Sequence, residues 1–307
     1  MHARVTRPGG SDGRVKFFGI WSNPAKDPNF VIAREVAAKL RALGSAVFVP
    51  SRLGIYPEWP ENELCEDPFF FRRVECIFVI GGDGTLLGVA RAASQYEIPL
   101  IGIRAGRKGF LTEIEIDQIP MAVESLVRRE YIVEKRMMLQ ITIECENEAQ
   151  TFLALNDVTF SYKDAAHMIH CALELGGEEI ARYHVTGLLV ATPTGSTAYS
   201  LSAGGPVVEP TASCILVTPI CSHSLSTRPM VLGDDAVLSV SVHEPEEGGM
   251  VTMDGQVSCL LRRGQRVTIQ KADQSTLLLR ILRQNFYHLL HEKLIEWGGN
   301  QPGKEGM

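Results

Sequence analysis

The sequence predicts an α/β N-terminal domain with a mostly parallel sheet, followed by a β-rich, sandwich-like second domain. In the first 130 of the 307 residues, apolar segments of strand length alternate with helical segments, which is the pattern of a parallel sheet. Farther on, segments such as 139–145 alternate apolar and polar residues, and glycine pairs at 176–177, 204–205 and 248–249 mark turns. Many short strands between turns are typical of a sandwich.

Four regions are expected along the chain. They are a loose leader at 1–14, the α/β domain at 15–130, the β-rich domain at 131–280, and a C-terminal region at 281–307. In the last region an apolar stripe from Phe286 to Trp297 predicts a helix that packs on the α/β domain, and the polar tail from Gly298 is expected to fray.

The α/β domain is expected to begin with a strand at 15–20. A helix follows, because Asp27 is a good N-cap, Pro28 suits the first helical position, and apolar residues recur at helical spacing up to Gly44. A second strand is predicted at 46–49, and residues 50–73 are expected to form loop and short helix.

The next segments complete this domain. Residues 74–80 are rich in β-branched side chains and show no solvent face, so a strand buried on both faces is predicted. A glycine turn, a helix to about Tyr96, a strand at 99–103 and a helix at 117–129 follow.

Composition narrows the class of protein. Apolar residues make up 45% and charged residues 21%, as in ordinary globular proteins. The net charge of −6 argues against binding to nucleic acid or to an anionic membrane, each of which favours a basic face. We see no signal peptide and no apolar segment of membrane-spanning length.

The seven cysteines are odd in number and never show C-x-x-C spacing. Several lie inside apolar segments, where a free cysteine is usually a small core residue. A disulfide framework is therefore not expected, and a reducing cytoplasm is the predicted compartment.

The turn that follows the 74–80 strand, Gly81-Gly82-Asp83-Gly84-Thr85, is the first candidate site. Glycines let an anion approach the backbone, and the N–H groups of a turn that starts a helix bind phosphate. Asp83 is unusual there, because a carboxylate repels a phosphate unless a metal ion or a reacting hydroxyl lies between them. The misfit suggests phosphoryl-transfer catalysis; the alternative is a tight turn with no ligand.

Two familiar phosphate motifs do not fit this turn. The dinucleotide fingerprint G-x-G-x-x-G would need a glycine one position before Gly88, and the Gly-Lys-Ser/Thr end of a P-loop is missing.

A second candidate site is the hydroxyl-rich segment 191–206, which follows the apolar residues 187–190. Neutral donors and acceptors, with the aromatic face of Tyr199, suit a sugar or a nucleoside. The alternative is a Ser/Thr-rich loop whose hydroxyls bond to the local backbone.

Together these segments resemble the NAD kinase family, in its bacterial or archaeal ATP-dependent type. The resemblance covers nearly the whole chain, in the order GGDGT at 81–85, GFLTE at 109–113, Asn156-Asp157-Val158, TPTGSTAYSLSAGGP at 192–206, TPICSHSLSTRP at 218–229, Asp254-Gly255-Gln256, and Phe286-Tyr287 with Lys293 and Trp297. The glycine turn is shared with diacylglycerol, sphingosine and phosphofructo-kinases, so the 192–206 segment identifies the family more specifically.

The resemblance implies transfer of a phosphoryl group from ATP to the 2′-hydroxyl of the adenosine ribose of NAD, giving NADP. Asp83 would be the general base, and the phosphates would be held by Gly81, Gly82, Gly84 and Thr85 with a divalent metal, Mg²⁺ by expectation. The β-rich domain at 131–280 would bind the dinucleotide together with a few residues of the α/β domain. The binding residues would be Asp83, Gly84, Phe110, Asn156, Asp157, His167, His184, Thr186, Thr197, Ala198, Tyr199, Ser202 and Gln256. The family also implies a homo-oligomer, a dimer or tetramer.

Two positions depart from the family pattern. Arg104 replaces a neutral amide in Gly-Ile-Asn-x-Gly, and Thr186 replaces an aspartate that contacts the dinucleotide. Both changes make the acceptor site less negative, which favours a more highly phosphorylated ligand or a different way of holding NAD.

Three other interpretations remain open. They are a kinase of the same fold that acts on another nucleoside or a polyol, a non-catalytic NAD- or NADP-binding regulator, and a structural α/β protein. The histidine pairs 167/170 and 288/291 are spaced for a metal only if helical, and no further Cys/His cluster accompanies them, so no protein-bound metal site is predicted.

Overall fold

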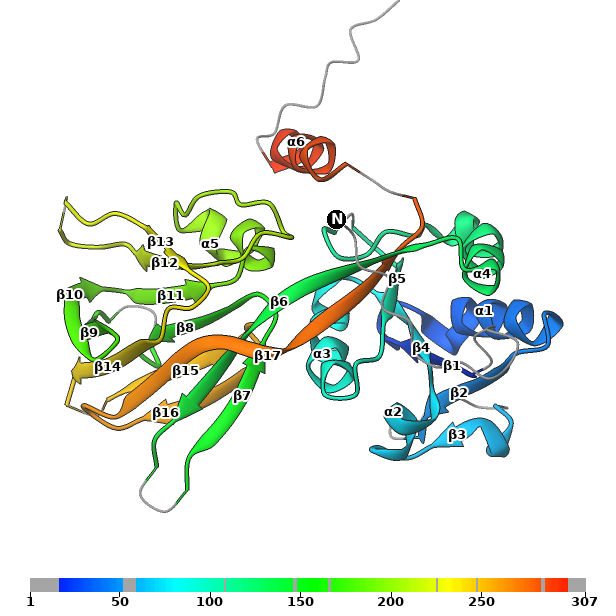
Figure 1. Cartoon of the computed structure of the whole chain (residues 1–307), viewed down its shortest axis with the longest axis horizontal. Helices are drawn as coiled ribbons and strands as arrows, with labels where there is room; N and C mark the ends of the chain where they lie inside the picture. Colours follow the sequence, from blue (N-terminus) through cyan, green and yellow to red (C-terminus); the bar gives the residue numbers. More distant parts are fainter. Residues whose placement is uncertain are drawn as a thin grey trace, which may run out of the picture. The chain divides into compact units, whose positions relative to one another are not determined.

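The computed structural model describes residues 17–51, 59–107, 109–145, 148–164, 167–224, 226–246, 248–282 and 285–297. The predicted leader at 1–14 and the predicted tail from 298 lie outside these ranges. Two compact units are present: unit 1 comprises Met1–Glu134 with Leu277–Met307, and unit 2 comprises Lys135–Thr276. Two long strands, β6 and β17, carry the chain from one unit to the other (Figure 1).

Unit 1 is an α/β unit. Its elements are β1 (Phe17–Ser22), η1 (Pro28–Phe30), α1 (Val31–Ala42), β2 (Ala46–Pro50), η3 (Glu61–Glu63), β3 (Leu64–Cys65), α2 (Phe69–Arg73), β4 (Cys76–Gly81), α3 (Asp83–Ser94), β5 (Leu100–Arg104), η4 (Ile116–Gln118), α4 (Ile119–Arg128) and α6 (Phe286–Trp297). The end of β17 joins this sheet in the order β17-β5-β4-β1-β2-β3, and each of these pairings is parallel. The predicted parallel sheet is therefore confirmed.

The centre of this sheet is buried on both faces. Every residue of β4 is buried, as the continuous apolar segment predicts. Apolar side chains of α1 and α4 form one core with β1, β4 and β5, and α3 covers β4 and β5 with Leu86 against Gly102. The carboxyl ends of β4 and β5 thus lie side by side, with Gly81 opposite Arg104 in register.

The start of the first helix differs from the prediction. Asn29 and Phe30 have positive φ, so Pro28 begins a 3-10 turn and α1 begins at Val31. Asp27 still caps α1, because its carboxylate accepts the backbone N–H groups of Ile32 and Ala33 at 2.9 and 3.0 Å. The short strand β3, inside the expected loop at 50–73, was also not predicted.

Unit 2 is a sandwich of two sheets. Its elements are β6 (Ile132–Ile143), β7 (Gln150–Ala154), β8 (Asp157–Ser161), β9 (Ile169–Leu175), β10 (Glu178–Val185), β11 (Gly187–Ala191), η5 (Thr194–Thr197), α5 (Tyr199–Ser202), β12 (Cys214–Ile220), β13 (Met230–Gly233), β14 (Leu238–Glu244), β15 (Gly249–Met253), β16 (Val257–Leu261) and β17 (Arg266–Arg280).

One sheet runs β10-β9-β14-β17, with β6 paired to β17 and β7 to β6; the other runs β13-β12-β11-β8-β15-β16. In the first sheet β10-β9, β9-β14, β14-β17 and β6-β7 pair antiparallel, and so do all neighbouring strands of the second sheet. A single apolar core includes residues of both sheets. This confirms the predicted β-rich second domain. Within the described ranges, every helix is too short or too polar to span a membrane.

Candidate active site

The glycine turn connects β4 to α3 in unit 1. A Cβ on Gly81 would lie 2.5 Å from Thr85 Oγ1, so only glycine allows the Thr85 side chain to pack over the end of the strand. Asn23 Nδ2 donates to the same Thr85 oxygen at 2.9 Å. By contrast, a Cβ on Gly82 would meet no heavy atom within 4 Å. The start of the turn is therefore held by the packing of Thr85 on Gly81, while the space beside Gly82 is open. This open space lies before the N-terminus of a 12-residue helix, where anions are favoured.

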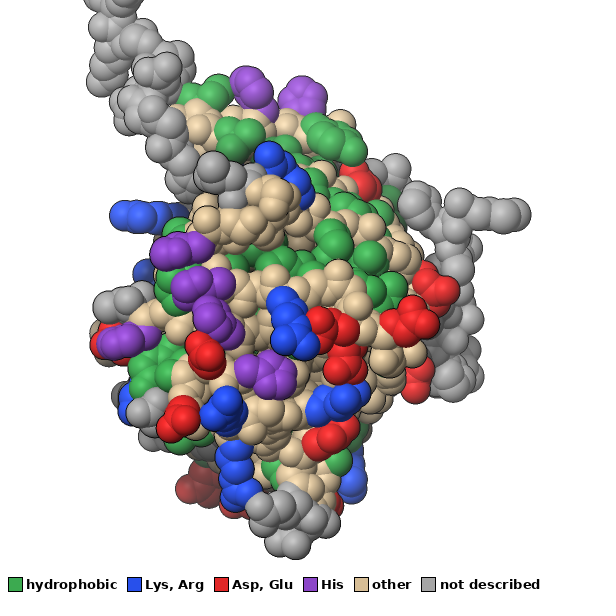
Figure 2. Space-filling view, turned by 90° about the vertical axis from the view of Figure 1, so that its left-hand side faces the viewer, with side chains coloured by type: hydrophobic (Ala, Val, Ile, Leu, Met, Phe, Trp, Pro, Cys, Tyr) green, Lys and Arg blue, Asp and Glu red, His purple; other side chains and the backbone are tan. Residues whose placement is uncertain are grey.

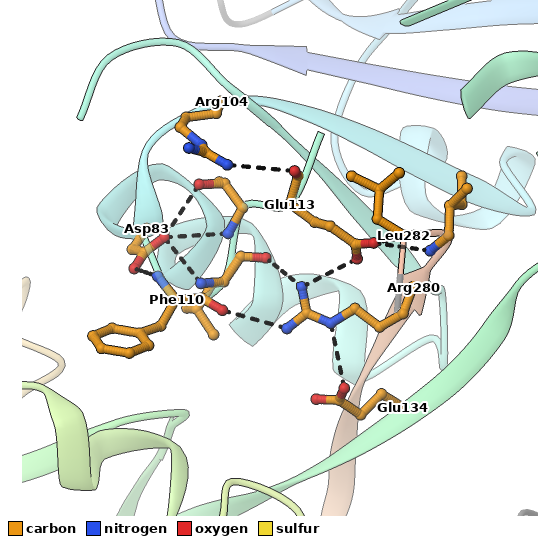
Figure 3. Close-up of polar contacts among 10 residues, drawn as sticks. Asp83, Arg104, Phe110, Glu113, Glu134, Arg280 and Leu282 are labelled. Carbon is orange, nitrogen blue, oxygen red and sulfur yellow. Dashed lines mark hydrogen bonds and ion pairs between the residues drawn. The ribbon is translucent and has the colours of Figure 1, made fainter. Parts of the chain in front are cut away.

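The Asp83 carboxylate is held by the segment 110–112, which follows β5 (Figure 3). Oδ2 accepts the Phe110 N–H at 2.7 Å, and Oδ1 accepts the N–H groups of Leu111 and Thr112 at 3.1 and 3.3 Å. Thr112 Oγ1 lies 3.4 Å from Oδ1. Backbone donors thus fix the orientation of Asp83 while Oδ2, with one such bond, retains a free acceptor position.

Gly109 makes this arrangement possible. A Cβ at this position would lie 1.9 Å from Asp83 Oδ1 and 2.5 Å from its Cγ. The glycine of the GFLTE motif therefore permits the close approach of the loop to the carboxylate.

Phe110 lies between this loop and the C-terminal helix. Its ring centroid is 6.1 Å from that of Phe286, and Lys293 Nζ lies 5.2 Å from the Phe110 centroid. Helix α6 thus contacts the loop that binds Asp83.

Arg104 does not add free positive charge to the turn. Its side chain is buried, its Nη1 lies 2.7 Å from Glu115 Oε1, and its Nη2 lies 3.4 Å from the Glu113 carbonyl (Figure 3 shows the latter contact). The guanidinium is thus paired with Glu115 within unit 1, and the effect of Arg104 on the charge of the acceptor site stays a prediction.

In unit 2, Asp254 brings three of the predicted site positions together. Its carboxylate accepts the N–H groups of Asn156 at 2.7 Å, Leu155 at 3.1 Å and Asp157 at 3.2 Å. Its own N–H donates to the Asp157 carbonyl at 2.8 Å, and Gln256 closes the adjoining turn with an N–H bond to Met253. The segment at 155–157 is therefore fixed against the 254–256 turn.

Asp157 has an unusual proton affinity. The pKa of its carboxyl is raised from 3.8 to about 7, chiefly by burial and in addition by the neighbouring Asp254 carboxylate, while a hydrogen bond with the Thr159 side chain partly opposes both effects. Near neutral pH this side chain can therefore either donate or accept a hydrogen bond.

Replacing Asp157 by asparagine is expected to stabilise the protein more in alkaline than in acidic solution. The folded-state pKa lies above the ordinary value of 3.8, so the wild type is most stable with the carboxyl protonated and loses stability as the pH rises from about 4 through about 7. We expect a gain in the free energy of unfolding on the order of 2 kcal/mol at pH 8 over the gain at pH 5. Urea unfolding at both pH values measures this difference.

The exposed Asp273 offers a matched control, because Asp273→Asn is expected to change stability equally at both pH values. An Asp157→Asn effect that is the same at pH 5 and pH 8 would contradict the assigned burial.

The hydroxyl-rich segment has a mostly structural interior. Thr192, Thr194, Ser196, Thr197 and Ser200 are all buried. Their hydroxyls bond, respectively, to the Leu155 carbonyl, Arg136 Nη1, the Val208 backbone, the Thr194 carbonyl and the Thr218 hydroxyl.

Much of the segment therefore bonds internally, as the alternative interpretation of a Ser/Thr-rich loop expects. Tyr199 and Ser202 remain exposed and Ala198 is half-buried, so these three positions present the segment to solvent.

The predicted histidine and threonine positions lie in other parts of unit 2. The His184 ring contacts His170 edge-on and His223 at a tilt, with ring-centroid distances of 4.0 and 4.9 Å, and His170 Nδ1 lies 2.7 Å from Glu244 Oε2. Several histidine side chains gather on the face shown in Figure 2. The cost of desolvation lowers the His184 pKa, and the charges of the two other imidazoles lower it further.

His167 and Thr186 lie outside this histidine cluster. His167 is exposed beside Asp164 and Tyr162, while the Thr186 hydroxyl donates to the Ile220 carbonyl at 3.0 Å. His170 lies in β9, so the 167/170 pair is not helical. Among the described residues, no three His, Cys, Asp or Glu side chains are placed to hold a metal ion.

Sequence reasoning missed several residues that organise the surroundings of Asp83 in unit 1 and the segment 155–157 in unit 2. Gly109, Glu113 and Asp254 lie in motifs that supported the resemblance, but no role was predicted for them. Arg280 had no sequence signal at all.

Comparison with known proteins identifies the chain's relatives. The model of the ATP-NAD kinase N-terminal domain matches residues 18–131, and that of the ATP-NAD kinase C-terminal domain matches residues 155–281. The NAD kinase of Symbiobacterium thermophilum is 38% identical over 275 residues, or 89% of this chain and 96% of the relative. The NAD kinase of Heliobacterium modesticaldum is 36% identical over 278 residues, or 90% of this chain and 97% of the relative.

Solved structures agree with these relationships. Yeast NADH kinase complexed with NADH matches the fold with a TM-score of 0.84 at 21% identity, covering 99% of this chain and 95% of that chain. The NAD kinase from Archaeoglobus fulgidus in complex with ATP gives a TM-score of 0.70 at 25% identity, covering 91% of this chain and 98% of that chain. The two domain matches and the full-length relatives show that this chain belongs to the NAD kinase family.

Proposed function

We propose that this protein transfers the γ-phosphoryl group of ATP to the 2′-hydroxyl of the adenosine ribose of NAD, forming NADP. Its family supports this reaction, and so does the ATP complex of the Archaeoglobus relative. The observation that favours catalysis over simple binding is the Asp83 carboxylate, which is fixed by three backbone N–H groups in the first turn of α3 and keeps acceptor capacity at Oδ2.

In this proposal Asp83 is the general base. A carboxylate in hydrogen-bond reach of the ribose hydroxyl accepts its proton as the hydroxyl oxygen attacks the γ-phosphorus, and the bond to the leaving oxygen of ADP breaks. The turn formed by Gly81, Gly82, Gly84 and Thr85 holds the phosphates through its backbone and the helix N-terminus.

We propose Phe110, Asn156, Asp157 and Gln256 as dinucleotide-binding residues. Phe110 belongs to the loop that fixes Asp83, and the other three belong to the group around Asp254. Tyr199 offers an exposed aromatic face. The remaining proposed positions are His167, His184, Thr186, Thr197, Ala198 and Ser202.

A divalent metal, Mg²⁺ in our proposal, fits this arrangement as a companion of the nucleotide. The described residues offer no preformed cage of metal ligands, and Mg²⁺ is usually held by substrate phosphates with one or two carboxylates. The nucleotide phosphates would hold the metal, and it would neutralise their charge in the turn that carries Asp83.

NAD is favoured over another acceptor because both sequence departures are accounted for within the fold. The Arg104 cation is paired with Glu115, and the Thr186 hydroxyl is bonded to the Ile220 carbonyl. The seven cysteines are all unpaired, which supports a reducing compartment such as the cytoplasm. We also propose a homo-oligomer, as the family resemblance implies.

The proposal is tested by incubating purified protein with ATP, MgCl₂ and NAD and measuring NADP with an NADP-specific dehydrogenase. NADP formation that requires all three components is expected. Absence of NADP, or faster turnover of adenosine, NADH or a polyol in a parallel panel, would overturn NAD as the acceptor.

A further inference from the structure

A single arginine faces the opposite side of the loop that holds Asp83. Arg280, at the end of β17, donates from Nη1 to the Leu111 carbonyl at 3.0 Å and from Nη2 to the Phe110 carbonyl at 3.4 Å (Figure 3). The N–H groups of the same two peptide units belong to Leu111 and Thr112, and both donate to Asp83 Oδ1. Each peptide unit therefore lies between a guanidinium at its carbonyl end and a carboxylate at its N–H end.

This order of charges strengthens both sets of hydrogen bonds. The negative end of each peptide dipole faces the cation and the positive end faces the anion, so each bond polarises the next. The two arms of the planar guanidinium also fix two successive carbonyls at once, which a point charge such as an ammonium does less well.

Acidic side chains hold Arg280 in place. Its Nε donates to Glu134 Oε2 at 3.3 Å, and its Nη1 lies 3.6 Å from Oε2 of Glu113, which is only 3% exposed. The other oxygen of Glu113 accepts the N–H groups of Ile281 and Leu282, the residues that follow Arg280. Burial raises the Glu113 pKa, and the charge of Arg280 partly opposes that rise.

We propose that Arg280 is a positioning residue for phosphoryl transfer, acting on Asp83 through the peptide units 110–111 and 111–112. This inference rests on the proposed role of Asp83 as base. Glu113 holds Arg280 in position, because its carboxylate lies near the guanidinium and accepts the N–H groups of the two residues that follow Arg280. Without Arg280 the loop loses its outer anchor, and the carboxylate loses the orientation that places Oδ2 for the ribose hydroxyl.

The test compares kcat and KM for ATP and NAD in Arg280→Gln, Arg280→Lys and the wild type. We expect Arg280→Gln to lower kcat about 10- to 100-fold, as misplacement of a catalytic group by about 1 Å does, with each KM within about threefold of wild type. Arg280→Lys should recover part of kcat. The control Arg266→Gln removes an arginine of the same strand that is exposed and paired with Glu174, and it should leave kcat unchanged.

A double-mutant cycle separates positioning from a general structural effect. If Arg280 acts through Asp83, adding Arg280→Gln to Asp83→Asn should lower kcat by less than about threefold more. A full additional loss in the double variant, or a loss expressed only in KM, would overturn the proposal.

Other outcomes distinguish the two assignments. A wild-type kcat in Arg280→Gln beside an inactive Asp83→Asn overturns the role of Arg280 alone, whereas a wild-type kcat in Asp83→Asn overturns the base assignment and with it the route proposed for Arg280.

Folding is checked by thermal melting, because Arg280→Gln leaves Glu113 buried without its cation. If that variant does not fold, the paired change Glu113→Gln with Arg280→Gln takes its place. The glutamine amide oxygen at 113 can still accept the N–H groups of Ile281 and Leu282. The same loss of kcat is expected for this double variant, and the same results would contradict the proposal. Arg280→Lys keeps the cation beside Glu113, so its kcat can be compared with that of the wild type even if Arg280→Gln does not fold.

Discussion

Replacing Asp83 by asparagine is expected to lower kcat by about 10²- to 10⁴-fold, the range that a general base contributes. The amide has nearly the same shape as the carboxylate, but it cannot accept a proton from the ribose hydroxyl. Its oxygen can still accept backbone N–H groups, so the loop at 110–112 keeps part of its anchorage. NADP formation under saturating ATP and NAD gives kcat, and calorimetric titration gives the affinity for NAD.

The dinucleotide affinity should change only severalfold, because the proposed contribution of Asp83 belongs to the transition state. Asp117→Asn is a matched control: the same chemical change at an exposed aspartate of the segment after the GFLTE motif should leave kcat at the wild-type value. A wild-type kcat in Asp83→Asn would rule out a general base at this position.

Replacing Gly195 by alanine is expected to destabilise the protein by about 3 kcal/mol and to lower Tm by roughly 5–10 °C. The new Cβ would lie 2.1 Å from the Asn156 carbonyl oxygen and 2.6 Å from the carbonyl carbon. These backbone atoms have little freedom to move, because the same carbonyl accepts the Thr192 N–H at 2.9 Å and the Asn156 N–H is bound by Asp254.

The sign of the effect is informative, because a glycine-to-alanine change without a clash usually stabilises by restricting the unfolded chain. Gly233→Ala is the matched control in the same unit. Its Cβ would approach the end of the exposed Asp235 side chain at 2.5 Å, and that side chain can rotate away. We expect the control to change stability by less than about 0.5 kcal/mol. Scanning calorimetry measures both, and equal melting temperatures for Gly195→Ala and Gly233→Ala would contradict the packing described here.

The parts of the fold that the sequence predicted well depend on short-range patterns. The continuous apolar segment from 76 to 80 can hardly be solvated on either face, and it forms most of the fully buried β4. The start of the helix after Asp27 was harder to predict, because the left-handed conformation of Asn29 and Phe30 delays it. Asparagine adopts this conformation more often than most residues, but phenylalanine gives no such signal.

The candidate site was predictable where one motif contains all of its parts. Gly81 to Thr85 act within five positions, so residue types alone suggested a phosphate turn beside a carboxylate. The partners of Asp83 lie 27 to 29 residues away, and only the folded chain brings them to it. Arg280 is one of 30 Lys and Arg residues, and no local pattern distinguishes it from the others.

The internal bonding of the hydroxyl-rich segment also bears on affinity for ligands. Thr192, Ser196 and Ser200 are fixed to Leu155, Val208 and Thr218 while the chain folds, before any ligand arrives. Their side-chain and backbone entropy is therefore lost during folding, and a dinucleotide bound beside Tyr199, as proposed above, would have little left to order. Under that proposal the segment is a preorganised template, and the free energy of the few exposed contacts would appear as affinity because little of it would be consumed by ordering the loop.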